Sequence, residues 1–543
     1  MRRNAGNATL GVTVLLVAVP AVVLIARAFM SQGLPEPAAL QQETLVAAAA
    51  RAPAAAAPGA AGAPSKEEAA AGSFSGADVV DLARKLAAAP PRARGTVTPG
   101  LEQLTYDQYR DIRFRIDQAL WTSDGLPFRL DVLPAGFVYT APVTVSIVDN
   151  GNVMPLVPSP QMFELGPHVP DALRGKSLSM SGFRVRTQLN SRNYWDEFLV
   201  FQGASYFRAV GRGQNYGLSA RGLALRTAEP QGEEFPSFTE FWIEKPKPAA
   251  TALVIHALLE SPSVTGAYRF TVTPGRETVM DVEFTLFPRV DLYNVGIAPL
   301  TSMFLFDGTN HQRFDDFRFR VHDSDGLLFM TEQGEQVWRQ LANPRNLQLS
   351  SFTEERPHAF GLMQRARLLA DFQDLEANYE RRPSAWVQFQ EGTAPGALRL
   401  IEIPTPNETN DNIVAFWQPR DVLLTGQPYT GAYRLSWTAD ALVPQSVGKF
   451  TAARLGTNFQ GDHKIVVLDL AGLGTDPAGL DLKVSSSTGK LFHPVIQTNP
   501  TIRGLRASFE FDPAGAPLVE FRAQVLKGDR AVSETWLYRW TAN

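Results

Sequence analysis

The alternation of apolar and polar positions after about residue 100 predicts β-strands. Residues 268–272 carry an apolar side chain at every second position, a Pro-Gly turn follows at 274–275, and residues 280–286 resume the alternation. Side chains two apart along a strand share a face, so these runs predict a hairpin with one buried face. The same pattern returns at 519–525. Stretches with a helical period are scarce after residue 120, so we predict an all-β protein.

A sheet with one apolar face must pack that face against another layer, which favours two β-sandwiches. We expect a large sandwich over residues 95–438 and a small one over residues 450–543. The segment between them, 439–449, contains Pro444 and has no clear period. We interpret it as a linker.

One short helix is predicted ahead of the strands, within a helix and Pro-rich lead-in at 75–94. Ser75 can cap the helix, Asp78 stands three positions later, and an apolar face begins at Val79 and continues through Leu82 and Leu86. We expect this helix to dock on the large sandwich. A dimer contact is the alternative.

The N-terminal residues have the pattern of an exported protein. Arg2 and Arg3 precede an uncharged apolar run at 8–26, which is long enough to span a bilayer. Residues 1–31 are therefore expected to be a cleaved signal peptide or a retained membrane anchor. Residues 32–74, rich in Ala and Pro, are expected to form a disordered tether.

Composition then excludes several classes of function. The 51 basic and 55 acidic residues nearly balance, so the basic surface that nucleic acid requires is absent. The chain has no Cys, which excludes disulfides and thiolate metal sites. Phosphate-loop, HExxH and GxSxG patterns are also missing. Acid-base chemistry by carboxylates remains, with no metal and no other cofactor expected.

Several acidic clusters are candidates for that chemistry, among them Asp315 with Asp316, Asp371 with Asp374, and two further segments. Residues 322–326 read His-Asp-Ser-Asp-Gly, and residues 405–412 form a polar island directly before the apolar run 413–417. Both segments could also be ordinary turns, since Asp, Asn and Ser bond to their own backbone. The carboxylate of Asp411 would nevertheless lie just before the start of a predicted strand.

Exposed aromatic residues near such carboxylates would suit a sugar ligand, because the C–H face of a sugar ring is apolar while its hydroxyls need polar partners such as Arg and Asp. Each aromatic residue is also a candidate for the core. The candidates for stacking are Tyr206, Phe207, Tyr216, Trp242, Tyr379, Trp386 and Trp417.

Several stretches of the chain resemble the periplasmic glucan biosynthesis proteins G and D. The resemblance covers most of residues 100–438 and is weaker afterwards, although 533–538 also fits. The matching stretches are 203–210, 216–224, 233–236, 259–268, 296–304, 322–326 and 408–414.

The resemblance implies a large galactose-mutarotase-like β-sandwich followed by an immunoglobulin-like domain, in the periplasm, acting on osmoregulated β-1,2-linked glucan. Members of the family are inverting β-1,2-glucanases, and some relatives transglycosylate. The implied partners are the glucan, the inner-membrane glucan glucosyltransferase and a second copy of the chain. A non-catalytic glucan-binding scaffold is a further alternative.

The resemblance also implies roles for particular residues. Asp411, in Glu-Thr-Asn-Asp-Asn, matches the general acid, and Asp323, in His-Asp-Ser-Asp, matches the general base. We expect a raised pKa for Asp411 and an ionised Asp323 held by hydrogen-bond donors. The residues expected to bind substrate are Tyr379, Arg382, Glu408, Tyr206, Arg208, Tyr216 and Trp417.

One segment departs from the family pattern. Relatives have a long Gly- and Trp-rich loop that helps to close the cleft across a dimer, whereas the corresponding segment here, 451–464, is shorter. This difference puts the water route in doubt, because a more open or reshaped cleft could favour transfer to a sugar hydroxyl over hydrolysis, or leave a weak enzyme.

Overall fold

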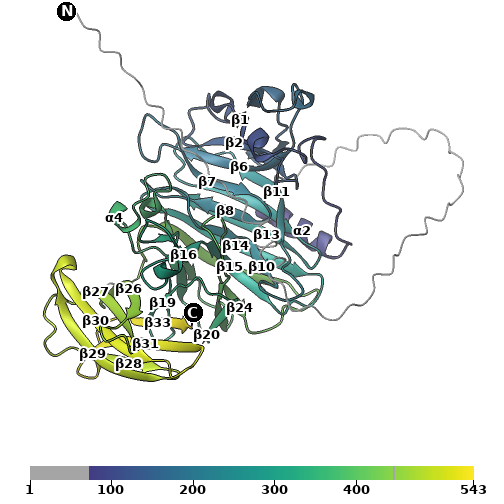
Figure 1. The fold of residues 1–543 in the computed structure, drawn as a ribbon. Coiled ribbons are helices and arrows are strands. Elements are labelled where there is room, and N and C mark those ends of the chain that lie inside the picture. Colours follow the sequence, from purple (N-terminus) through teal and green to yellow (C-terminus); the bar gives the residue numbers. More distant parts are fainter. Residues whose placement is uncertain (1–72, 444–446, 543) are drawn as a thin grey trace, which may run out of the picture.

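The computed structural model describes residues 73–443 and 447–542 (Figure 1). The expected signal or anchor at 1–31 and nearly all of the expected tether lie outside these residues. Within the described part of the chain, no helix is long and apolar enough to cross a membrane.

The all-β prediction is confirmed, because two large sheets dominate the structure. The first sheet has ten strands. Their order is β2 (Arg129–Pro134), β6 (Met180–Thr187), β7 (Asp196–Gln202), β8 (Tyr206–Ala209), β9 (Ser219–Arg221), β15 (Val295–Ser302), β24 (Ile413–Pro419), β23 (Gly396–Glu402) and β20 (Gln348–Glu354), with β10 (Leu223–Leu225) also beside β15.

The second sheet has fifteen strands and crosses from one end of the molecule to the other. Their order is β28 (Asp481–Ser486), β31 (Leu518–Lys527), β33 (Thr535–Thr541), β19 (Gln336–Gln340), β18 (Gly326–Met330), β21 (Ala359–Met363), β22 (Ser384–Phe389), β25 (Tyr429–Thr438), β14 (Thr278–Pro288), β13 (Val264–Thr273), β12 (Leu253–Glu260), β11 (Ser237–Glu244), β3 (Thr144–Asp149) and β4 (Asn152–Pro155), with β32 (Arg530–Ala531) beside β31.

Smaller elements complete the fold. A four-stranded sheet has the order β26 (Lys449–Thr457), β27 (Lys464–Ala471), β30 (Gly504–Asp512) and β29 (Lys490–Asn499). Two short pairs are β1 (Ile112–Phe114) with β5 (Phe163–Leu165), and β16 (Phe304–Phe306) with β17 (Val321–His322). The described α-helices are α2 (Gly76–Ala87), α3 (Tyr106–Arg110) and α4 (Leu369–Phe372), and the short 3-10 helix η5 spans Tyr379–Arg381.

A phenylalanine-rich core joins the two large sheets. From the ten-stranded sheet, Phe201 and Phe207 place their ring centroids 5.2 and 5.3 Å from that of Phe270 on β13. The ring of Phe183 meets Phe241 edge-on at 5.0 Å. Edge-to-face contacts at these distances add to the stabilisation from burial itself. The predicted hairpin is the pair β13 and β14, with its apolar positions on the core side.

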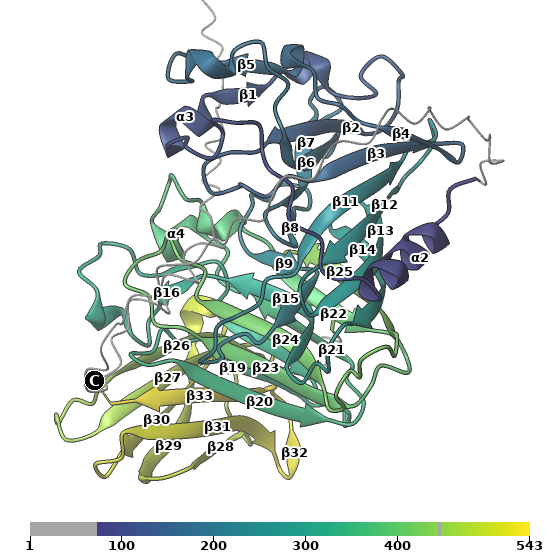
Figure 2. The same ribbon diagram turned by 90° about the vertical axis from the view of Figure 1, so that its right-hand side faces the viewer.

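The two sandwiches share a sheet. β19 of the large sandwich pairs in parallel with β33 of the small one, so that Trp338 lies opposite Trp536. Figures 1 and 2 show the C-terminal strands, in yellow, gathered at one end of the molecule. Because β25 ends at Thr438 and β26 begins at Lys449, we propose that the chain passes between the sandwiches at 439–449.

The predicted helix is present as α2 and packs on the outer face of the fifteen-stranded sheet. The backbone N–H of Ser75 donates to Asp78 Oδ2 at 2.6 Å, as expected for the helix start. Val79 and Ala83 are fully buried against Leu258 and neighbouring residues of the sheet. The predicted face is shifted slightly, since Leu82 and Leu86 are only partly buried.

We expect Glu534→Gln to destabilise the junction between the sandwiches. Glu534 is buried and accepts hydrogen bonds from Arg365 Nη2 at 2.8 Å and from the Phe450 backbone N–H at 2.7 Å. Neutralising it leaves Arg365 without its counter-charge, a change that costs about 3 kcal/mol for a buried pair. Urea unfolding measures this loss. As a control, Glu355→Gln breaks the exposed pair with Arg420 and should change stability little.

Candidate active site

The candidate site lies on the face of the ten-stranded sheet opposite the phenylalanine core. On β8, Phe207 enters the core, so the neighbouring Arg208 faces the other way. Arg208 Nε donates to Ser219 Oγ on β9 at 2.5 Å. Its Nη2 lies 3.7 Å from Oδ2 of Asp411, which stands two residues before the start of β24 (Ile413–Pro419). The sheet thus brings the predicted binding arginine on β8 to the predicted acid before β24, with β9 and β15 between these two strands.

Asn412 anchors the loop that carries Asp411. Its side-chain Oδ1 accepts from the Phe304 backbone N–H at 2.8 Å, and its Nδ2 donates to the carbonyls of Phe304 and Ile403, each at 3.0 Å. Asn412 is buried, so these three bonds fix the loop between β16 and β23. Sequence reasoning included Asn412 in a polar island without assigning this positioning role.

Burial raises the pKa of Asp411 to about 6. The carboxylate of Asp323 raises this pKa further, whereas the guanidinium groups of Arg208 and Arg382 lower it. Oδ2 of Asp411 is buried and makes no hydrogen bond. The expected elevation of this pKa is therefore confirmed, and its main cause is loss of solvation.

Asp323 lies in a different setting. It follows β17, is buried, and forms an ion pair with Nη1 of Arg382. Its backbone N–H donates to the Met303 carbonyl at 2.8 Å. The expectation of a carboxylate held by a donor matches this geometry.

Gln364 connects the Asp323 segment to the segment of Tyr379. Its side-chain amide donates to the carbonyl oxygens of His322 at 3.3 Å and Tyr379 at 2.9 Å. Its Oε1 therefore accepts from Nδ1 of His322, at 2.7 Å. Burial lowers the pKa of His322 to about 3, so the ring is neutral. Gln364 is 42 residues from His322 in the chain, and no sequence pattern connects them.

Arg382 is packed between an aromatic ring and a glycine. Its guanidinium carbon lies 4.2 Å from the centre of the Tyr379 ring. A Cβ at Gly217 would stand 2.8 Å from Cβ of Arg382, so only glycine permits this approach. The Asn215 N–H also donates to the Arg381 carbonyl at 3.1 Å. The loop that carries Tyr216 is thereby held against Arg382, which pairs with Asp323.

Tyr216 reaches the charged residues on β6 and β7. Burial and the neighbouring Glu197 carboxylate raise its pKa well above the usual value. Glu197 in turn pairs with Arg184 at 3.0 Å. The predicted binding residue Tyr216 therefore borders a buried polar network on the same face of the sheet as Arg208.

Glu408 belongs to a cluster of charges centred on Arg318. The guanidinium Nη2 lies 2.6 Å from Glu408 and 2.7 Å from Asp316, and Nη1 lies 2.8 Å from Asp374. One arginine thus connects three loops, one of which is the loop that carries Glu408 and Asp411. The sequence analysis did not assign a role to Arg318.

Trp417 must be removed from the predicted binding set. It is 2% exposed, its ring packs against Phe389, and its Nε1 donates to the Ala394 carbonyl at 3.2 Å. Its partners across the sheet are the core residues Ile297 and Leu398. Strand alternation therefore turns Trp417 to the core side, away from Asp411.

Tyr206 and Tyr379 are also buried, so neither offers an open face for stacking on a sugar. Burial raises the pKa of Tyr206 to about 12, and its hydroxyl has no hydrogen-bond partner. Among the other stacking candidates, Phe207 and Trp386 are core residues. Tyr379 instead packs against the guanidinium of Arg382, and Tyr206 lies 5.2 Å from that of Arg221.

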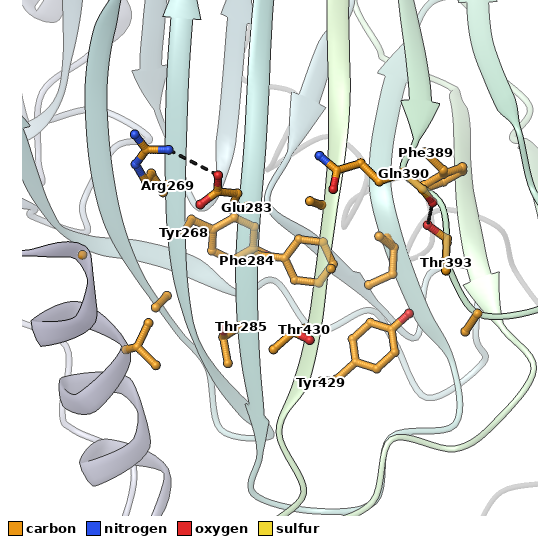
Figure 3. A pocket seen from close by; sticks show the side chains of 18 of the residues that line it. Tyr268, Arg269, Glu283, Phe284, Thr285, Phe389, Gln390, Thr393, Tyr429 and Thr430 are labelled. Atoms are coloured by element: carbon orange, nitrogen blue, oxygen red, sulfur yellow. Dashed lines mark hydrogen bonds and ion pairs between the residues drawn. The ribbon is translucent and has the colours of Figure 1, made fainter.

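A separate hollow of about 680 Å³ lies on the fifteen-stranded sheet, between α2 and the loop after β22 (Figure 3). Its lining includes Tyr429, Thr430 and the ion pair of Arg269 with Glu283, at 3.3 Å. None of the candidate catalytic carboxylates lines it. The hollow is therefore separate from the candidate carboxylates.

The short segment 451–464 is a β-hairpin of the small sandwich, formed by β26, a turn at 458–463 and β27.

Across residues 73–443 and 447–542, no group of three or more His, Asp or Glu side chains is placed to hold a metal ion.

The chain belongs to the periplasmic glucan biosynthesis protein family. The model of that family, described as "Periplasmic glucan biosynthesis protein, MdoG", matches residues 74–540. Membership assigns the chain to glucan biosynthesis and implies the periplasm.

Relatives of known name agree with this assignment. "Glucans biosynthesis protein G" of Vibrio cholerae serotype O1 is 47% identical over 475 residues, which cover 87% of each chain. The proteins of that name from Shewanella sp. strain ANA-3 and, as "Glucans biosynthesis protein G 1", from Shewanella oneidensis have the same identity and coverage.

Among solved structures, a galactose mutarotase related enzyme from Lactobacillus acidophilus aligns with 45% of this chain and 98% of its own. The TM-score is 0.21 and the identity is 7%.

We expect Asp411→Asn to change the pH dependence of stability. The folded-state pKa of about 6 exceeds the ordinary value of 3.8, so the folded protein binds this proton more tightly than the unfolded chain. The resulting stabilisation is present below pH 3.8 and is lost as the pH rises through about 6. Asn cannot ionise, so the variant should gain up to about 3 kcal/mol relative to wild type between pH 4 and pH 7. Urea unfolding at both pH values measures this gain, and a difference that does not change with pH contradicts the assignment.

Proposed function

We propose that the protein hydrolyses β-1,2-glucan with inversion at the anomeric carbon, using Asp411 as general acid and Asp323 as general base. The observation that carries the proposal is the contrast between two neighbouring carboxyls. Burial raises the pKa of Asp411 to about 6, whereas Asp323 is paired with Arg382. Inverting hydrolysis requires one protonated and one ionised carboxyl on opposite sides of the scissile bond.

In this mechanism the bond between the anomeric carbon and the glycosidic oxygen breaks as Asp411 donates its proton to that oxygen. Water attacks the anomeric carbon from the opposite face, and its proton passes to Asp323. A water molecule or a sugar hydroxyl can relay either proton. Arg382 stabilises the charged form of Asp323 before the attack.

Arg208 and Glu408 are proposed to bind sugar hydroxyls beside Asp411. Arg208 has donors near the acid, and Glu408 is 35% exposed despite its pair with Arg318. Tyr216 is proposed to form the wall of the cleft on the side of β7. These three residues and Arg382 make up the proposed binding set, and the buried Tyr379 packs against the Arg382 guanidinium.

Transglycosylation by the same two carboxyls is the second candidate, with a sugar hydroxyl replacing the attacking water. The short hairpin favours it, since a segment shorter than the loop of the relatives would leave the cleft less enclosed. A less enclosed water route would leave acceptor sugars better placed to compete. Export by residues 1–31, a contact with the inner-membrane glucosyltransferase and a homodimer stay predictions.

Turnover of linear β-1,2-glucan tests the proposal. NMR of the products should show shorter chains whose new reducing ends first appear as the inverted anomer. Asp411→Asn and Asp323→Asn should each lower kcat about 10²- to 10⁴-fold. The exposed Asp481→Asn on β28 is the matched control and should keep wild-type activity.

The other outcomes separate the alternatives. Full turnover by Asp411→Asn rejects it as the acid. New linkages at constant numbers of reducing ends indicate transglycosylation, and binding without any product indicates a scaffold.

The pH profile tests the link between Arg208 and Asp411. Because the acid must be protonated, kcat/KM should fall as the pH rises above about 6. The charge of Arg208 lowers the pKa of Asp411, so Arg208→Gln should move this falling limb to higher pH. Arg208→Lys keeps the charge and should restore the limb toward its original position. A limb that does not move in Arg208→Gln contradicts this coupling.

A further inference from the structure

Residues 315–320 have an inverted amphipathic pattern. Phe317 is 76% exposed and Phe319 is 61% exposed. The charged side chains that alternate with them are largely buried: Asp316 is 18% exposed and Arg318 is 12% exposed. Soluble proteins do not ordinarily turn charges inward and phenylalanines outward along one short segment. Large apolar side chains exposed side by side indicate a contact surface.

Arg318 holds this segment in place. Its three carboxylate partners come from its own segment, from the loop after α4 and from the Asp411 loop. Leu375, which directly follows Asp374, is 79% exposed. Three exposed apolar side chains therefore directly adjoin members of the Arg318 cluster along the chain. We call Phe317, Phe319 and Leu375 the outer rim.

The outer rim is continuous with the proposed site. Arg318 contacts Glu408, which stands three residues before Asp411. Figure 2 shows α4 and β16, whose loops carry the rim residues, on the same side of the molecule. A polymer bound across Asp411 must leave the site over one of its borders, and the rim forms the border next to Glu408.

The charge of the cluster favours a neutral occupant. Arg318 pairs with the three carboxylates of Asp316, Asp374 and Glu408, so these four side chains together carry a net negative charge. An anionic membrane surface attracts basic clusters and would be repelled here. A glucan chain is uncharged and presents apolar C–H faces, which pack on phenylalanine rings.

We propose that the outer rim is an accessory sugar-binding subsite, on which glucose units of a long glucan stack after leaving the catalytic cleft. The proposal rests on the proposed function. It assigns the affinity for long chains to side chains that make no contact with the reacting bond.

Calorimetric titration of the Asp411→Asn protein tests the subsite, with long linear β-1,2-glucan and a β-1,2-linked trisaccharide as the two probes. Adding Phe317→Ala and Phe319→Ala should weaken binding of the long glucan about tenfold. Binding of the trisaccharide should be unchanged. Both side chains are exposed, so the fold should tolerate these changes.

Tyr293→Ala in the same background is the matched control. Tyr293 is 69% exposed and precedes β15, at the end of the sheet where β24 finishes. Asp411 precedes the other end of β24, roughly 20 Å away for a strand of this length. Affinity for both probes should stay the same in this control.

The remaining outcomes overturn the proposal. Unchanged affinity for the long glucan, or an equal loss for the trisaccharide, shows that the rim is no separate subsite. Loss of a dimer in sedimentation assigns the rim to a second copy of the chain, and loss of binding to phosphatidylglycerol vesicles assigns it to a membrane. If the Asp411→Asn protein binds neither sugar and wild type forms no product, the proposed function itself has failed.

Discussion

The two faces of the ten-stranded sheet have opposite physical requirements, and every feature of the site depends on their separation. Phe207 and Arg208 are neighbours on β8, yet one enters a phenylalanine core and the other meets Ser219 and Asp411. The same division occurs on β6, where Phe183 lies inside and Arg184 pairs with Asp131 at 2.9 Å. A register shift of one residue would bury the arginines in the core, so the alternation fixes the charged face.

That charged face is largely shielded from water, so its charges must pair. Arg221 pairs with Glu233 at 2.7 Å, and Asp323 pairs with Arg382. Asp411 is the exception, because its Oδ2 makes no hydrogen bond and the nearest cation is 3.7 Å away. Burial of a carboxyl with so little compensation raises its pKa. The unequal pairing of two acidic residues thus explains their proposed roles.

The fold was predictable because strand alternation is local. The hairpin of β13 and β14, the cap of α2 at Ser75 and the all-β class follow from spacing alone. The acidic segments of Asp323 and Asp411 were visible for the same reason, although family resemblance supplied their roles. Trp417 was wrongly placed because a strand residue can face either side, and only its partners Ile297 and Leu398 decide which.

Residues that position the site through long-range hydrogen bonds could not be predicted. Gln364 and Arg318 act across 42 and 56 residues of sequence, and amide and guanidinium groups have no periodic signature. The residues around Phe317 alternate visibly in the sequence, but the sequence does not show which of the two alternating sets is buried. An alternating run indicates which residues share a face, whereas burial of that face depends on the rest of the fold.

The small sandwich also bears on the catalytic segment, through Arg365. The backbone N–H of Arg365 donates to the carboxylate of Asp325, two residues after Asp323, at 3.1 Å. Its side chain pairs with Glu534 and lies 3.5 Å from the centre of the Trp338 ring. The parallel pairing of β19 with β33 holds both sides of this contact in one sheet. The small sandwich therefore helps to position the segment of the proposed base through Glu534, Arg365 and Asp325. This contact gives a physical reason for the two sandwiches to share a sheet.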